Sequence, residues 1–346
     1  TGDESTGVDD EDGVSISSMI AGGPATLTLT GTNLSGSQGY LNAWIDYNNN
    51  GVFTDAGEQV VTNVVISSGS SNSTRLINLT VPPAAVTNVN LGVRVRLTND
   101  ISPGSTGFGG VGEVEDFVVN IAAPITDFGD FSAFASASAE KNAGVRMGER
   151  LDTEYVQSAN PTANGDDLTD LDDEDGVSLP ALVAGGPATI PVQVTNSTGS
   201  SAYLNAWIDF NNNGVLTDAG EKVASDVVIS AGTSNALQDL SFTVPSVSLT
   251  GVNIGARFVL TKTMGAAASG SVGEGEVEDY IVNVQAPTTD FGDSSRFASA
   301  SQGVNPALRL GALLDAEFSA TTDPAATGDD VTGLDDEDGL NVQPMT

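Results

Sequence analysis

The sequence predicts an all-β protein made of tandem antiparallel β-sandwich domains. Apolar and polar residues alternate along short runs such as "NLGVRVRL", where Leu91, Val93, Val95 and Leu97 share one face. Gly, Asn, Ser and Pro separate these runs. The whole pattern returns 163 residues later, as shown by the loops "DYNNNGVFTDAGE" at 46–58 and "DFNNNGVLTDAGE" at 209–221. A sandwich of immunoglobulin-like or jelly-roll-like architecture is therefore expected in each repeat.

The individual strands are expected where the alternation is clearest. In the first repeat these runs lie near 14–20, 25–31, 39–47, 59–67, 74–81, 89–98 and 114–121. Seven short strands with turns at this spacing are typical of a sandwich. No segment shows a convincing amphipathic helix pattern.

The repeat divides the chain into four ranges. We expect a first sandwich with an N-terminal acidic motif at 1–123, a connector at 124–171, a second sandwich at 172–286, and a second connector with the start of a third repeat at 287–346. The connectors are rich in Ala, Ser, Gly and Asp, a composition that ordinarily marks flexible linkers. Their motifs nevertheless recur in register, with "DFGD" at 127–130 and again at 290–293. Ordered connectors are therefore expected.

Composition excludes several function classes. The chain has no cysteine and no histidine, so thiolate or imidazole zinc sites and histidine-based catalytic triads are ruled out. Lys plus Arg is 11 against 46 for Asp plus Glu, and the net charge of −35 repels nucleic acid and favours cations. No apolar run reaches the roughly 18 residues of a membrane-spanning helix. We expect neither a nucleic-acid partner nor membrane insertion.

The two glycine-centred loops are the first candidate metal sites. In "DYNNNGVFTDAGE", oxygen-bearing residues occupy positions 1, 3 and 5, glycine occupies position 6, and a backbone carbonyl is available at position 7, which is the opening of an EF-hand loop. The closing acid falls at position 13 instead of 12, so the loop is a variant. The candidate calcium ligands are Asp46, Asn48, Asn50, Val52, Asp55 and Glu58 in the first copy, and Asp209, Asn211, Asn213, Val215, Asp218 and Glu221 in the second. An Asx-rich hairpin turn without metal is the alternative.

The acidic runs "DDEDG" and the connector acids predict a second kind of metal site. Four successive acids before a strand are not required by any ordinary turn, and such clusters repel themselves unless cations neutralise them. The candidates in the runs are Asp9, Asp10, Asp12, Asp172, Asp173, Asp175, Asp335, Asp336 and Asp338. The candidates in the connectors are Asp127, Asp130, Asp152, Glu154, Asp166, Asp167, Asp290, Asp293, Asp315, Glu317, Asp329 and Asp330. A solvated acidic run is the alternative.

The motif "GEVEDF" at 112–117, repeated as "GEVEDY" at 275–280, aims Glu113 and Glu115 at the core side of a strand. An unpaired charge there is costly, so a partner is needed. Arg94, repeated as Arg257, is the favoured salt-bridge partner, with calcium and catalysis as the other readings. Glycoside hydrolysis by paired carboxylates is disfavoured because the same cluster occurs in each repeat and aromatic residues are scarce. Trp44 and Trp207 stand at strand centres and are interpreted as core residues.

The residues just described resemble the GEVED domain family, named for the motif at Gly112 to Asp116 and Gly275 to Asp279. The "AWIDxNNNGxxTDAGE" loop, "DFGD" and "DDEDGV" belong to the same resemblance, which covers nearly the whole chain. It implies tandem parts of large secreted or surface bacterial proteins, often beside adhesion modules, with no catalytic activity attributed to the domain.

The sequence therefore favours a non-enzymatic structural protein of an extracellular or cell-surface fibre, filament or stalk, with calcium stiffening its repeats. "DDEDG" occurs three times, so the chain holds two periods and the first 20 residues of a third. We expect a longer repeat array or a head-to-tail homopolymer of this chain, in which the terminal residues "LNVQPMT" pack on the next subunit by adding a strand to a sheet edge. The alternative function is an adhesin or carbohydrate-binding segment whose loops contact surface glycans.

Overall fold

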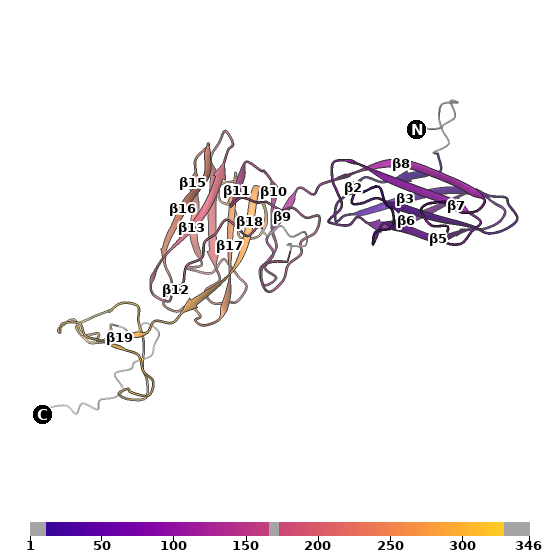
Figure 1. The fold of residues 1–346 in the computed structure, drawn as a ribbon. Coiled ribbons are helices and arrows are strands. Elements are labelled where there is room, and N and C mark those ends of the chain that lie inside the picture. Colours follow the sequence, from indigo (N-terminus) through magenta and orange to yellow (C-terminus); the bar gives the residue numbers. More distant parts are fainter. Residues whose placement is uncertain (1–11, 166–172, 329–346) are drawn as a thin grey trace. The chain divides into compact units, whose positions relative to one another are not determined.

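The computed structural model describes residues 12–165 and 173–328 and contains two compact units (Figure 1). The first unit comprises Thr1–Thr126 and Thr153–Val156, and the second comprises Asp127–Asp152 and Gln157–Thr346. The described residues contain strands and turns but no α-helix, which confirms the predicted all-β class. No helix in this part of the chain has the length and apolar character needed to cross a membrane.

The first unit is a sandwich of two sheets. Its smaller sheet has the order β1-β3-β6 and its larger sheet the order β2-β8-β7-β4-β5. The strands are β1 (Val14–Ile16), β2 (Met19–Ile20), β3 (Pro24–Asn33), β4 (Gly39–Ile45), β5 (Gln59–Ile66), β6 (Ser70–Thr80), β7 (Asn90–Thr98) and β8 (Gly112–Ala122). All neighbours pair antiparallel except β2 and β8.

The second unit repeats this sandwich and adds three strands from the connector. One sheet has the order β11-β13-β16, and the other runs β15-β14-β17-β18-β10-β9 with β12 also on β18. The sandwich strands are β12 (Leu182–Val183), β13 (Pro187–Asn196), β14 (Ala202–Ile208), β15 (Lys222–Ile229), β16 (Thr233–Thr243), β17 (Asn253–Thr261) and β18 (Gly270–Gln285). The connector strands are β9 (Thr126–Phe128), β10 (Ala137–Lys141) and β11 (Val145–Met147), and the short pair β19 (Thr289–Phe291) and β20 (Ser301–Gly303) follows the sandwich.

Alternation along the strands sorts side chains between the core and the outside. On β7, Leu91, Val93 and Val95 are buried in the core of the first unit together with Leu27 and Leu29 of the facing sheet. Burial of these aliphatic side chains supplies the main stabilisation, at about 1.5–3 kcal/mol for each large one. The same core recurs in the second unit.

The outer face of the large sheet differs between the units. In the second unit the connector covers this face, where Phe131 and Phe134 lie in a separate apolar cluster with Trp207 and Val277. Residues 127–152 are thus packed structure and not a free linker. Trp44 and Trp207 are each 3% exposed, which confirms that they are interior residues and not open platforms.

Candidate metal-binding loops and carboxylate cluster

The loop at 46–58 is closed around the side chain of Asp46. It joins β4 to β5, and the pair of these strands nearest to the loop is Trp44 and Gln59. Asp46 is 4% exposed, and its carboxylate accepts the backbone N–H groups of Asn50 (3.0 Å) and Gly51 (2.8 Å). Gly51 has a φ of 79°, a conformation that glycine adopts without strain. The first acid therefore holds the sharp turn that an EF-hand-like loop and an Asx-rich turn both need.

The middle of the loop is held by its own amides. The Nδ2 groups of Asn48 and Asn50 each donate to Asp55 Oδ2 at 2.7 Å, and these hydrogen bonds lower the pKa of Asp55. Asn50 Oδ1 accepts the N–H of Val52 at 2.8 Å. These contacts are those of an Asx-rich turn, and they bring Asp46, Asn48, Asn50 and Asp55 together as the sequence predicted.

Glu58 is the residue that an ordinary turn does not explain. Its side chain is 2% exposed, and no hydrogen bond of normal geometry reaches either carboxylate oxygen. Burial raises the pKa of Glu58, the charges of Asp46 and Asp55 raise it further, and nearby backbone amides offset part of the rise. A buried carboxylate facing two others is costly unless it is protonated or neutralised by a cation.

The second loop repeats every feature of the first. Asp209 is fully buried and accepts the N–H groups of Asn213 (3.1 Å) and Gly214 (2.8 Å). Asp218 Oδ2 accepts the side-chain amides of Asn211 (2.9 Å) and Asn213 (2.8 Å). Glu221 is 2% exposed without a hydrogen-bond partner for either oxygen, and burial, aided by Asp209 and Asp218, raises its pKa to about 7. Val52 and Val215, the predicted carbonyl donors, have exposed side chains.

A second group of carboxylates is buried in the second unit. Asp127 and Asp173, both predicted ligands, are 1% and 4% exposed. They lie near Glu276 and Glu278 of the GEVED motif, which are fully buried. Burial raises the pKa of Glu276 well above its ordinary value, and three neighbouring carboxylates raise it further: Glu278, Asp127 and Asp173. Sequence reasoning gave Glu276 and Glu278 an arginine partner, and their place beside the "DFGD" and "DDEDG" acids was missed.

Backbone amides satisfy part of this cluster. Asp127 Oδ2 accepts Val277 N–H at 2.7 Å, and Asp173 Oδ2 accepts Asp152 N–H at 2.7 Å. Glu278 accepts the N–H of Gly176 and the hydroxyl of Tyr280, while Glu276 Oε1 has no hydrogen-bond partner. The cluster combines several buried acids with few donors, which is the chemistry that a hard cation stabilises.

Other predicted ligands serve turns or lie elsewhere. Asp130 and Asp293 accept the N–H groups of Gly165 (2.6 Å) and Gly328 (3.1 Å), and exposed Asp175 accepts that of Glu149. The remaining described candidates lie in the connectors or beside β1: Asp12, Asp152, Glu154, Asp290, Asp315 and Glu317. Ten candidates lie outside the described residues: Asp9, Asp10, Asp166, Asp167, Asp172, Asp329, Asp330, Asp335, Asp336 and Asp338.

The expected salt bridge from Arg94 to the motif glutamates is wrong. Arg94 instead makes a two-point contact with Asp116, with Nε to Oδ1 at 2.7 Å and Nη2 to Oδ2 at 2.6 Å. Register explains the difference, because Arg94 stands directly opposite Asp116, whereas Glu113 and Glu115 point to the other face of β8. Arg257 and Asp279 form the same pair, fully buried.

Across residues 12–165 and 173–328, no three Asp or Glu side chains form a ready-made metal-binding group. A cation in either loop would therefore need the Asn oxygens and backbone carbonyls besides the acids, as calcium commonly does in loops of this kind. The residues present fit such a donor set, since Glu58 and Glu221 are the buried acceptors that it would use.

Comparison with known proteins identifies the repeats. The family model of the GEVED domain matches residues 40–120 and 203–283. No curated protein sequence matches the chain. Among solved structures, the CBD12 domains of CALX1.2 are similar at 9% identity over 76% of this chain and 94% of that one, with a TM-score of 0.20. The IG1 and IG2 domains of DIP-gamma give 10% identity, 80% and 98% coverage and a TM-score of 0.22.

A third similar structure is red sea bream transglutaminase, at 11% identity over 79% of this chain and 31% of that one, with a TM-score of 0.22.

Proposed function

Because the chain carries two GEVED domains in tandem, we propose that it is a non-enzymatic structural segment of an extracellular fibre, filament or surface stalk, stiffened by calcium. The observation that carries this proposal is the buried carboxylate of Glu58, repeated by Glu221, in a loop with EF-hand-like spacing. Glu58 and Glu221 are buried acids at equivalent places, and each faces two other carboxylates, which favours a shared ligand over a local accident.

The carboxylate cluster of the second unit supports the same role. Asp127 comes from the connector and Glu276 from the sandwich, so a cation held between them would fix the connector on the sandwich. The mechanism is mechanical: neutralising the crowded acids would turn a self-repelling segment into a rigid one. Extracellular calcium modules bind at roughly 10⁻⁴ to 10⁻³ M, a range that millimolar calcium outside cells would fill.

Repetition also supports a role without catalysis. The two loops and the two motif strands carry the same acids in both units, whereas an enzyme seldom repeats one active site in each domain. In the buried ion pair of the second unit, Arg257 is bound to Asp279 and to the carbonyl of Ala268. Neither side chain of this pair is a free nucleophile or base.

Small-angle scattering of the whole chain tests this function. In millimolar calcium the maximum dimension and radius of gyration should be sharply defined, and excess chelator should broaden the distance distribution and lower the melting temperature. A particle whose dimensions and melting temperature are the same with and without chelator would refute the stiffening role. Protection from unfolding by a panel of surface glycans, without any response to calcium, would instead indicate a carbohydrate-binding module.

A further inference from the structure

In the second unit, residues 127–147 form a docking segment that wraps around strand β18. Residues 131–139 cover the outer face of the large sheet, where Phe131 and Phe134 are each 7% exposed. Strand β10 pairs in parallel with the first part of β18, with Ser138 opposite Ser271. Strand β11 then passes to the other sheet and pairs with β13, with Met147 opposite Val194.

The GEVED motif holds the backbone of this docking segment. Phe131 N–H donates to Asp279 Oδ2 at 3.0 Å, and Arg257 Nη1 donates to the carbonyl of Ala135 at 2.7 Å. Met147 N–H donates to Glu276 Oε2, and Met147 itself is fully buried in the main core. Glu276 and Asp279 of the motif, together with Arg257, therefore form a clamp that holds a segment preceding the sandwich in sequence.

The first unit has the same clamp, and among the described residues no segment is docked on it, although the Phe53 ring lies over Arg94 at 5.7 Å, much as the docked Phe134 ring lies over Arg257 at 5.2 Å. Arg94 and Asp116 have side-chain exposures of 28% and 53%, against 0% for both Arg257 and Asp279. Val114 is 50% exposed, whereas its counterpart Val277 is 2% exposed. Phe108, the counterpart of Ser271, is 93% exposed.

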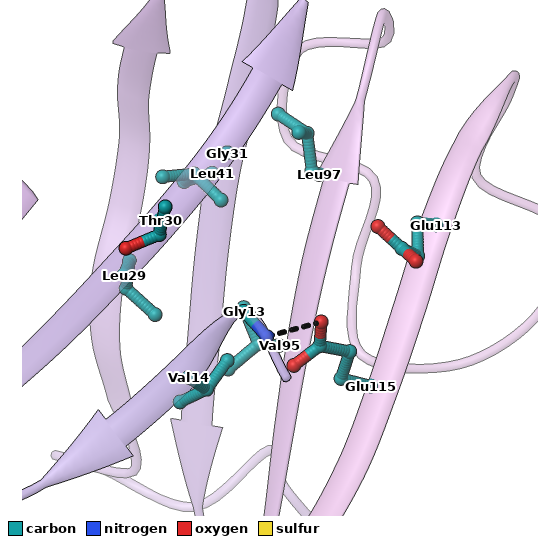
Figure 2. Close-up of a pocket in the computed structure, with 10 residues that line it drawn as sticks. All are labelled: Gly13, Val14, Leu29, Thr30, Gly31, Leu41, Val95, Leu97, Glu113 and Glu115. Atoms are coloured by element: carbon teal, nitrogen blue, oxygen red, sulfur yellow. Dashed lines mark hydrogen bonds between the residues drawn. The ribbon is translucent and has the colours of Figure 1, made fainter. Parts of the chain in front are cut away.

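The place of Met147 is an open pocket in the first unit. Figure 2 shows this pocket between β3 and β8, with Leu29, Gly31, Leu97 and Glu113 around it. Its cavity volume is about 20 Å³, room for a single water, so the side chain of Leu97 must shift before a larger side chain can enter. The counterparts of these lining residues surround β11 in the second unit, where Val194 pairs with Met147 and Glu276 accepts its N–H.

Gly92 in β7 is the counterpart of Gly255, which lies under the docked Phe134 ring in the second unit. A Cβ on Gly255 would lie 2.4 Å from Phe134 Cζ, so the docked ring demands glycine there. Gly92, its counterpart, would meet nothing closer than Phe53 Cζ at 3.7 Å, an ordinary contact. The first unit thus has a glycine at position 92 although a Cβ would fit there, and glycine weakens a strand. A docked aromatic ring would explain this glycine. The ring of Phe53 must turn aside for docking, and the smaller Leu216 stands at its counterpart.

A matching segment is presented, undocked, by residues 290–310. Phe297, Leu308 and Leu310 are the counterparts of Phe134, Val145 and Met147 by the 163-residue repeat. Their exposures are 77%, 81% and 73%, against 7%, 0% and 0% for the docked residues. Three large apolar side chains on one short segment are the usual mark of a protein contact.

We propose that residues 290–310 of one copy of this chain dock on the first unit of a second copy, with Leu310 in the pocket of Figure 2, Phe297 over Gly92, and the Arg94–Asp116 pair holding the incoming backbone. The interaction combines strand addition to an open sheet edge with apolar anchoring. It rests on the proposed function, because it names the contact that joins subunits of the filament. The described residues of each copy offer one such segment and one such clamp, so the contact joins two different surfaces of the chain.

Cysteine pairing tests the register. The chain has no cysteine, and the pairing of Ser138 with Ser271 predicts that Ser301 of one copy lies opposite Phe108 of the next. A mixture of Ser301→Cys and Phe108→Cys chains should give a disulfide-linked dimer under mild oxidation. Ser301→Cys mixed with Leu237→Cys, which is also exposed but lies on β16, is the control and should give none. Equal yields in the two mixtures would overturn the proposal.

Blocked variants test the direction of assembly by analytical ultracentrifugation. Gly92→Leu blocks the clamp, Leu310→Asp disables the segment, and Leu237→Asp is the matched control. Each blocking variant alone should be monomeric, with association weakened at least about tenfold relative to the control. Their equimolar mixture should form a one-to-one complex and nothing larger. An unmodified chain that stays monomeric at all concentrations would refute docking between copies.

Calcium titration distinguishes docking between copies from stiffening by calcium. Pairing of Ser301→Cys with Phe108→Cys in chelator, without calcium binding to the chain, would support docking and refute calcium stiffening. Calcium binding without that pairing would support the stiffening and overturn docking.

Discussion

At the scale of single residues, the sequence predicted which loop side chains come together, but it did not predict which acids are buried. The EF-hand-like order of Asp46, Asn48 and Asn50 depends only on neighbouring positions, and the structure brings these side chains together. The burial of Glu58 depends on the tertiary packing of the loop, which local spacing does not reveal. The partner of Arg94 depends on the register of β7 against β8, which places Asp116 opposite it.

The buried acid of the second loop gives the sharpest test at this scale. Glu221→Gln should stabilise the calcium-free protein at pH 7 by about 1–3 kcal/mol, because it removes a buried charge that faces Asp209 and Asp218. The same change should weaken calcium binding, since the amide is a poorer ligand than the carboxylate. Urea unfolding in chelator and calorimetric titration would measure the two effects.

The expected gain in stability depends on pH with a definite sign. The pKa of Glu221 is raised to about 7, so between pH 4.5 and 7 the folded state holds a proton that the unfolded state has released. The native protein thus loses stability as pH rises through this window, and the advantage of Glu221→Gln should shrink towards zero near pH 4.5. Asp239→Asn, an exposed acid on β16, is the control and should show neither effect. A destabilised Glu221→Gln protein in chelator at pH 7 would contradict the assignment.

At the scale of elements, the sandwich strands followed from alternation and the connector strands did not. The predicted runs near 39–47, 59–67 and 89–98 correspond to β4, β5 and β7. Strands β9, β10 and β11 have only three to five residues each, too few positions for a period to show. Recurrence of their motifs indicated order, but only the structure shows what they pack against.

Two equivalent glycines provide a matched test of the docked connector. Gly255→Ala should destabilise the second unit by about 1–3 kcal/mol, because the new Cβ would overlap the ring of Phe134. Gly92→Ala should be neutral or slightly stabilising in the first unit, where the same Cβ meets only an ordinary contact. Hydrogen exchange followed by mass spectrometry would report each unit separately. Equal losses in both units would mean that the glycines serve the strands themselves and not the docked ring.

At the scale of the whole molecule, the distribution of charge separates two explanations of the acidic composition. A net charge of −35 is compatible with a generally acidic, salt-adapted surface or with specific cation sites. The structure buries Asp209, Glu221, Glu276 and Glu278 of the second unit to 2% exposure or less, and the two loop acids are buried again in the first unit as Asp46 and Glu58, at 4% and 2%. Surface adaptation does not bury carboxylates, so specific sites account better for these residues.

The two explanations differ in how the protein should respond to ions. A site-bound cation stabilises by mass action, so each tenfold rise in free calcium above the dissociation constant should add about 1.4 kcal/mol per site, or roughly 3–5 °C for a unit of this size. Sodium at the same ionic strength screens exposed charges but does not fill a site of six to eight oxygens, and its effect should level off well below that of calcium. Thermal melts across both titrations would measure the difference. Sodium matching calcium at equal ionic strength would show that screening, and not coordination, relieves the buried acids.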